Sequence, residues 1–119
     1  MTLFNRIIRP VLFSIDAELA HSISIKLLKA NLVQPAKIDH APILHSVVWG
    51  KEFRNPVGLA AGFDKNASAI SSLYSLGFGF VEVGTVTPKP QSGNPKPRMF
   101  RYPEVRGVVN RLGFNNLGT

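Results

Sequence analysis

The sequence contains no cysteine, so it can form no disulfide and can offer no thiolate as a nucleophile or metal ligand. This absence fits a protein from a reducing compartment. The three histidines, His21, His40 and His45, lack the spacing of metal ligands, so we expect no metal site.

Several enzyme signatures are also missing. The glycines from Gly58 to Gly62 do not follow the Gly-x-Gly-x-x-Gly pattern of a dinucleotide-binding turn. No Gly-Lys-Ser/Thr sequence closes a phosphate loop, and no Gly-x-Ser-x-Gly elbow presents a nucleophilic serine. The sequence therefore disfavours these three classes of enzyme.

Long apolar runs are absent too. Arg6, Arg9, Asp16 and Glu18 interrupt the apolar N-terminal segment, which never reaches the ~20 apolar residues that a membrane-spanning helix needs. Arg9 and Pro10 lie where a cleaved signal peptide would be apolar. We expect neither a spanning helix nor a signal peptide.

Acidic residues are scarce: 7 Asp and Glu stand against 14 Lys and Arg, which gives a net charge of +7. A solvated basic surface is the commonest reason, and an anionic partner (a phosphate, a carboxylate substrate or an acidic lipid) is the sharper one. The basic residues form no dense block and do not alternate with aromatic residues, so we expect no nucleic-acid partner.

Residues 2–33 predict two short helices. Apolar residues recur at helical spacing up to Leu12, and Pro10 should bend or divide this segment. Asp16 predicts the N-cap of a second helix that ends near Asn31. Two interpretations stay open, packing on the core or contact with a membrane surface, and the pattern alone favours packing.

From Val57 onward the pattern is strand, helix, strand. An apolar strand at 57–61 precedes a helix that Asn66 should cap and Gly77 should end, and a second strand follows at 80–83. Such a unit predicts parallel strands with a right-handed crossover, which is an α/β fold. Before it, residues 35–54 predict a linker and a small β-hairpin that turns at Gly50.

Both predicted strands end in polar residues, at 62–65 and at 84–87. Because the carboxyl ends of parallel strands meet at one edge, we expect the two turns to face one ligand. Lys65 should lie at a helix start, where the helix dipole disfavours a cation, and this misplacement favours a binding role over a surface role.

Two later segments complete the expected site. Residues 88–103 hold five of the nine prolines, which predicts a stiff loop that forms a lid or wall. Asn110 and Asn115 carry amides that both donate and accept, which suits an imide or carboxylate ring, although ordinary turn roles explain them equally well.

Three blocks of the sequence resemble dihydroorotate dehydrogenase: Asn55-Pro-Val-Gly-Leu-Ala-Ala-Gly-Phe-Asp-Lys65, residues 77–98 and residues 110–118. The N-terminal helices, with Asp16-Ala-Glu-Leu-Ala-His21, resemble the class 2, quinone-dependent branch. The implied fold is α/β, the N-terminal part of a (β/α)8 TIM barrel preceded by a two-helix hairpin. A complete barrel needs ~250 residues, so we expect this chain to be the opening part of a larger one.

The resemblance also implies a function and a division of the chain. The family oxidises dihydroorotate to orotate in pyrimidine synthesis, passes a hydride to FMN, and reoxidises the flavin with a membrane quinone. Residues 1–34 would be the quinone-tunnel and membrane-contact extension, 35–54 the linker and hairpin, and 55–119 the first two barrel strands. Membrane contact of the helices thus becomes the favoured interpretation, at the cytoplasmic face of a bacterial inner membrane.

The resemblance further implies site residues. Those expected at the cofactor are Ala61, Gly62, Phe63, Asp64, Lys65 and Thr85. Those expected at the substrate are Lys65, Asn110, Arg111, Leu112, Gly113 and Phe114, and those expected in the quinone tunnel are His21 and Arg101. The catalytic serine base of the class 2 branch has no counterpart here, so we expect the 119 residues alone to be inactive. The alternatives are a soluble class 1-like flavin barrel and a non-enzymatic membrane- or anion-binding module.

Overall fold

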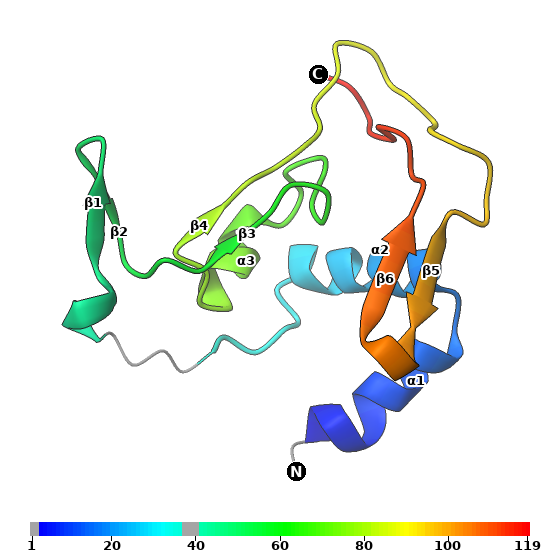
Figure 1. Ribbon diagram of the computed structural model, residues 1–119, viewed down its shortest axis with the longest axis horizontal. Helices are drawn as coiled ribbons and strands as arrows, with labels where there is room; N and C mark the ends of the chain where they lie inside the picture. Colours follow the sequence, from blue (N-terminus) through cyan, green and yellow to red (C-terminus); the bar gives the residue numbers. More distant parts are fainter. Residues whose placement is uncertain (1–2, 37–40) are drawn as a thin grey trace.

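The computed structural model describes residues 3–36 and 41–119 (Figure 1). His40 and part of the predicted linker lie outside the described residues. Along the chain the elements are η1 (Phe4–Ile8), α1 (Arg9–Ser14), α2 (Ala17–Lys29), η2 (Pro42–Leu44), β1 (Ser46–Val48), β2 (Lys51–Phe53), β3 (Gly58–Leu59), α3 (Ile70–Ser75), β4 (Phe80–Val81), β5 (Met99–Tyr102), η3 (Pro103–Val105) and β6 (Gly107–Asn110).

The two predicted N-terminal helices are present. The π-helix η1 continues directly into α1, and Pro10 lies in the first turn of α1, where a missing backbone N–H costs nothing. Asp16 caps α2 as predicted, because its carboxylate accepts a hydrogen bond of 2.9 Å from the backbone N–H of Leu19. The helix ends at Lys29, and Asn31 follows with a left-handed φ of 55°.

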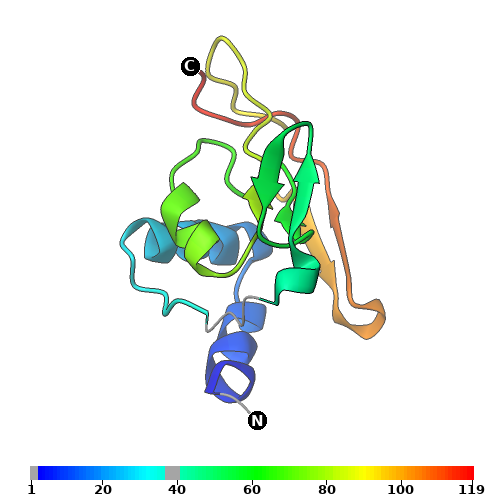
Figure 2. The same cartoon turned by 90° about the vertical axis from the view of Figure 1, so that its left-hand side faces the viewer.

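The small β-hairpin is confirmed. Strands β1 and β2 pair antiparallel, with Val47 opposite Glu52. Trp49 and Gly50 form the turn, both with positive φ (51° and 73°), as the tightest hairpin turns require. The hairpin lies on the opposite side of the molecule from α1 and α2 in Figure 1, and it faces the viewer in Figure 2.

The strand–helix–strand unit is also confirmed, with shorter strands than predicted. β3 and β4 pair parallel, with Gly58 opposite Phe80. The ring of Phe80 occupies the space over Gly58, since a Cβ there would lie 2.1 Å from ring atoms. Glycine at position 58 therefore allows the aromatic ring to cover the strand pair.

The predicted cap of the next helix was wrong. Asn66 does not cap α3; its side chain accepts from the backbone N–H of Leu117 at 2.9 Å. Asp64 instead holds the turn before α3: its buried carboxylate accepts from the backbone N–H groups of Ser68 at 2.9 Å and Ala69 at 2.8 Å, which precede the first helical residue, Ile70. The chain makes an extra turn before the helix, and this turn brings the earlier carboxylate beneath those N–H groups.

One consequence concerns Lys65. It precedes the first residue of α3, Ile70, by five positions, so it does not lie at a helix start as the sequence pattern predicted. The dipole argument for its role is therefore wrong, and its role must be judged from its contacts. Gly77 does end the helix as predicted, with φ of 107°.

Replacement of Asp64 by alanine is expected to lower the free energy of unfolding by about 2–3 kcal/mol, because the buried N–H of Ala69 and the partly buried N–H of Ser68 lose a charged acceptor. Asn66→Ala is the matched control and should cost about 0.5–1 kcal/mol, since it loses one exposed hydrogen bond. Urea unfolding of the full-length protein measures both. Equal losses for the two variants would contradict the role of Asp64 in holding the turn before α3.

The small core lies between α2, α3 and the β3–β4 pair. Leu28, Ala69 and Leu73 are buried together, and Leu73 is the largest fully buried side chain among the described residues. Five partly buried residues pack around them: Val33, Leu59, Phe63, Leu76 and Val81. Ser72 adds a polar link, since its hydroxyl lies 2.6 Å from the carbonyl oxygen of Leu28. The packing interpretation therefore holds for α2.

A second hairpin was missed. Residues 99–102 fall in the segment predicted as loop, yet they form β5, which pairs antiparallel with β6. The flanking prolines, Pro97 and Pro103, obscured a strand whose own four residues carry no proline. The strand pair lies against α2 (Figure 1).

Candidate functional site

The two polar turns meet the C-terminal tail at one hollow of about 420 Å³. Ala61, Gly62 and Lys65 come from the turn after β3, and Gly84 and Thr85 follow β4. The other side is closed by Asn94 of the proline-rich loop and by the tail residues Asn110, Arg111, Leu112, Gly113 and Phe114. The structure thus brings together most of the residues that the sequence predicted for one site.

The backbone at Gly62 is open toward this hollow. Its φ of 107° is a conformation that L side chains rarely adopt, and a Cβ built on it meets no atom within 4 Å. A flat ligand can therefore approach the peptide backbone closely at this point. Gly84 has a similar φ of 124° on the neighbouring turn.

Lys65 lies half-buried between this hollow and a second one. Its ammonium donates a hydrogen bond of 2.5 Å to the side-chain oxygen of Asn115, which holds the amine in place. Burial lowers the pKa of Lys65 below its usual value of 10.5, the cation of Arg98 lowers it further, and Glu18 opposes both. The side chain is a positioned, partly buried cation.

The tail is held against the proline-rich loop by hydrogen bonds. Asn94 donates from its backbone N–H to the carbonyl of Leu112 at 3.0 Å and from its amide to that of Arg111 at 2.6 Å. The guanidinium of Arg111 donates to the carbonyl of Pro97 at 3.0 Å. The loop and the tail therefore form one wall of the hollow, and the hydrogen bond from Arg111 to Pro97 links the two.

The second hollow, of about 560 Å³, lies between α2 and the turn after β3. His21 enters it from α2: its Nε2 lies 2.6 Å from the carbonyl oxygen of Phe63, and the two rings meet edge to face at 5.1 Å. Because a carbonyl only accepts, Nε2 carries the proton. Phe63 and Asp64 line this second hollow, Ala61, Gly62 and Thr85 line the first, and Lys65 lines both.

Arg101 does not line either hollow. Its guanidinium donates to the carbonyl oxygens of Leu12 at 2.9 Å and Ile15 at 3.1 Å, at the connection between α1 and α2. It also lies 5.0 Å from the ring centre of Phe13. The two residues predicted for one tunnel thus have different surroundings, with His21 at the hollow and Arg101 under the helix connection.

Sequence reasoning missed Arg98 and Glu18, which form a largely buried ion pair beside the site. Arg98 is 7% exposed and donates to both carboxylate oxygens of Glu18, over 2.7–3.2 Å. This pair lowers the pKa of Glu18 and raises that of Arg98. No local signal links two residues that lie 80 positions apart.

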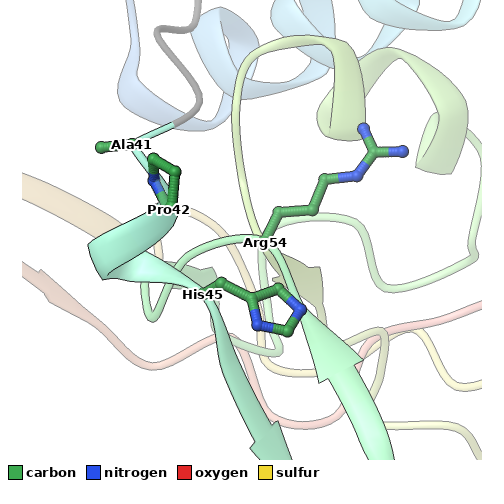
Figure 3. A pocket seen from close by; sticks show the side chains of 4 residues that line it. All are labelled: Ala41, Pro42, His45 and Arg54. Atoms are coloured by element: carbon green, nitrogen blue, oxygen red, sulfur yellow. The ribbon is translucent and has the colours of Figure 1, made fainter.

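A third hollow, of about 450 Å³, lies near the first hairpin and contains none of the predicted residues (Figure 3). Ala41, Pro42, His45 and Arg54 surround it. The guanidinium of Arg54 extends away from the His45 ring (Figure 3), whose Nε2 lies 3.8 Å from the carboxylate of Glu52. Polar groups do not converge here as they do at Lys65.

These features define an α/β protein with a ligand hollow at the carboxyl ends of two parallel strands. A family model described as dihydroorotate dehydrogenase matches residues 43–119, and the chain belongs to this family. The chain is 56% identical over 115 residues to the dihydroorotate dehydrogenase (quinone) of Rhizobium johnstonii, covering 97% of this chain and 32% of that protein. It is 50% identical over 113 residues to the enzyme of the same name from Rhodospirillum rubrum, covering 95% and 31%.

Solved structures agree. The chain is similar to DHODH from Eimeria tenella in complex with ferulenol, with a TM-score of 0.82 and 50% identity over 85% of this chain and 27% of that one. The ligand-free form gives the same TM-score over 87% and 28%. The predicted resemblance to the quinone-dependent branch is confirmed by the names of the curated relatives. The chain spans about a third of the length of those relatives.

Proposed function

We propose that this chain forms the N-terminal part of a quinone-dependent dihydroorotate dehydrogenase. The observation that carries the proposal is the single hollow that joins Lys65 and Thr85 to the tail residues 110–114. In this proposal β3 and β4 are the first two strands of a (β/α)8 barrel, residues 35–54 are the linker and hairpin, and residues 1–34 are the extension. The parallel pairing of β3 and β4 supports it.

The residues at the hollow fit FMN. The open backbone at Ala61 and Gly62 can lie against a flat ring, and the Thr85 hydroxyl and the Lys65 ammonium can face its polar edge. When bound, the flavin would take a hydride from dihydroorotate and pass electrons to a quinone. A fixed cation beside the ring would stabilise the negative charge that reduction creates. Phe63 and Asp64 would support the turn from its other side.

The tail residues fit the substrate. Dihydroorotate and orotate carry a carboxylate and an imide, and Asn110 can donate to and accept from such a ring. The Asn110 side chain already turns the tail, because its oxygen accepts from the backbone N–H of Leu112 at 3.4 Å. The proposed roles extend to Arg111, Leu112, Gly113 and Phe114, with Lys65 between substrate and flavin.

The N-terminal elements fit a membrane surface and a quinone path. Leu3, Phe4, Ile7 and Val11 are exposed on η1 and α1, and Arg9 can meet lipid headgroups. Among the described residues, no helix is long and apolar enough to span a bilayer. We propose peripheral attachment at the cytoplasmic face of a bacterial inner membrane, with His21 and Arg101 along the quinone path.

The test uses the full-length protein that carries this sequence. Purified protein should be yellow, dihydroorotate should bleach the flavin absorbance, and a ubiquinone analogue should restore it. Colourless protein that binds only anionic vesicles would instead favour the non-enzymatic membrane-binding module. Reoxidation by a soluble acceptor but not by the quinone analogue would favour the soluble class 1-like enzyme. The 119 residues alone should show no turnover, since the proposed serine base has no counterpart among them.

Binding of orotate is expected to weaken as pH rises through the lowered pKa of Lys65. The bound anion favours the ammonium form, so affinity is full below that pKa and falls above it, and burial places the fall below the usual 10.5. Titration of the flavin spectrum with orotate between pH 7 and about 10.5 measures this. Lys65→Arg should move the fall to higher pH, and an unchanged profile would contradict the assignment.

A further inference from the structure

The buried side chain of Arg98 holds in place the proline-rich loop that forms one wall of the candidate site. The Arg98 guanidinium donates from Nη1 to the carbonyl oxygens of Ser92 at 2.6 Å and Asn94 at 2.9 Å. The intervening Gly93 has φ of 72°, and a Cβ there would lie 2.2 Å from the carbonyl oxygen of Leu112 and 2.9 Å from Nη1 of Arg98. Loop, tail and arginine therefore lie too close for any side chain at position 93.

Another edge of the same guanidinium is held by Glu18 of α2. Its Nε and Nη2 donate to the Glu18 carboxylate at 2.7–3.2 Å. The side chains of Arg98 and Glu18 are 8% and 13% exposed, so water competes little for either charge. Lys96 lies 3.4 Å from the same carboxylate, but its side chain is 70% exposed and should contribute little. One carboxylate on α2 thus orients one arginine in the wall.

We propose that Glu18 is a positioning residue for the substrate wall: through Arg98 it fixes the carbonyls of Ser92 and Asn94, and through Asn94 the tail that faces the substrate. The proposal rests on the proposed function, because the wall faces a substrate only if the hollow binds one. Asn94 transmits the effect, since it bonds to both Arg111 and Leu112 of the tail.

The ionised state of Glu18 is part of this arrangement. Hydrogen bonding from Arg98 lowers its pKa below the usual 4.5, so the carboxylate is charged at neutral pH. A neutral amide of the same shape therefore removes the charge from the contact and leaves the helix surface intact. Glu18→Gln is the variant of choice, and Glu104→Gln, an exposed carboxylate on η3, is its matched control.

In the full-length enzyme, Glu18→Gln should raise KM for dihydroorotate about 10- to 100-fold, with kcat for a soluble dye acceptor changed by less than about 3-fold. Arg98→Lys should act alike, because a point charge cannot reach Glu18 and both carbonyls. Glu18→Asp, which keeps the charge, should reverse part of the rise in KM. The exchange Glu18→Arg with Arg98→Glu should recover nothing, since glutamate cannot donate to the carbonyls of Ser92 and Asn94.

A second measurement separates this proposal from the proposed function. Amide hydrogen exchange at residues 92–98 and 110–114 should be faster in Glu18→Gln than in wild type and in Glu104→Gln. If the wild type fails to oxidise dihydroorotate, the proposed function fails while the exchange result still reports on the contact. If the wild type is active and Glu18→Gln leaves KM unchanged, the positioning role is overturned. The role would also be overturned if Glu18→Gln raised KM and lowered kcat by the same factor and Glu18→Asp restored neither.

Discussion

Replacement of Lys65 by methionine is expected to lower kcat/KM for dihydroorotate by about 100- to 1000-fold in the full-length enzyme. The ammonium is half-buried, is held by Asn115 and lies where the proposed substrate and flavin meet. Among the residues lining the hollow, no second cation is placed to stabilise the charge that develops in the transition state, because the Arg111 guanidinium is hydrogen-bonded to Pro97. Steady-state assays with a dye acceptor measure the loss.

The fold should tolerate this change. Burial disfavours the charged form of Lys65, as its lowered pKa indicates, so an apolar chain of similar length should not destabilise the protein. Lys51→Met, at an exposed position on β2, is the matched control and should keep full activity. A Lys65→Met enzyme with kcat/KM within about 5-fold of the control would contradict the electrostatic role.

Substitution of Gly62 by valine is expected to reduce the flavin content of the purified protein by more than about 10-fold. Two effects act together: a β-branched residue is strained at φ of 107°, and its methyl groups would occupy the open space that the backbone offers to the ring. The ratio of flavin to protein absorbance measures the loss.

Gly50→Val separates the two effects. Gly50 also has positive φ (73°) and open space around its would-be Cβ, but it lies in the turn of the first hairpin, which contributes no residue to the hollow. This control should suffer similar backbone strain and keep its flavin. Equal loss of flavin in both variants would show that strain alone explains the result, and full flavin content in Gly62→Val would remove position 62 from the cofactor site.

Local rules predicted the local features of the fold. Asp16 begins α2 and Gly77 ends α3 as the side-chain and backbone requirements dictate, and Gly50 turns its hairpin. The rule failed for Asn66, because the chain makes a further turn after it and the Asn66 side chain accepts from Leu117 instead of a helical N–H. Strand β5 was missed because its pairing partner, not its own composition, makes it a strand.

The candidate site was predicted in part for the same reason. Lys65 and Thr85 follow apolar strands, so parallel pairing alone brings them together. Asn110 joined them on the chemistry of its amide, and Arg111 to Phe114 joined through a resemblance between sequences, since no spacing rule places the tail near Gly62. The pairing of Arg98 with Glu18 could not be predicted at all, because neither residue carries a local sequence signal for it. Such long-range pairs require the fold itself.

The distance along the chain between Glu18 and Arg98 has a consequence for biosynthesis. At about 5–20 residues per second, a ribosome needs about 4–16 s to add the 80 residues between them. During that interval the acidic side chain of Glu18 lacks its partner, and until Leu73 has been added the apolar face around Leu28 lacks its packing partner as well. Residues 17–29 of the nascent chain can therefore bind a chaperone or a lipid surface before their partners within the chain have been synthesised.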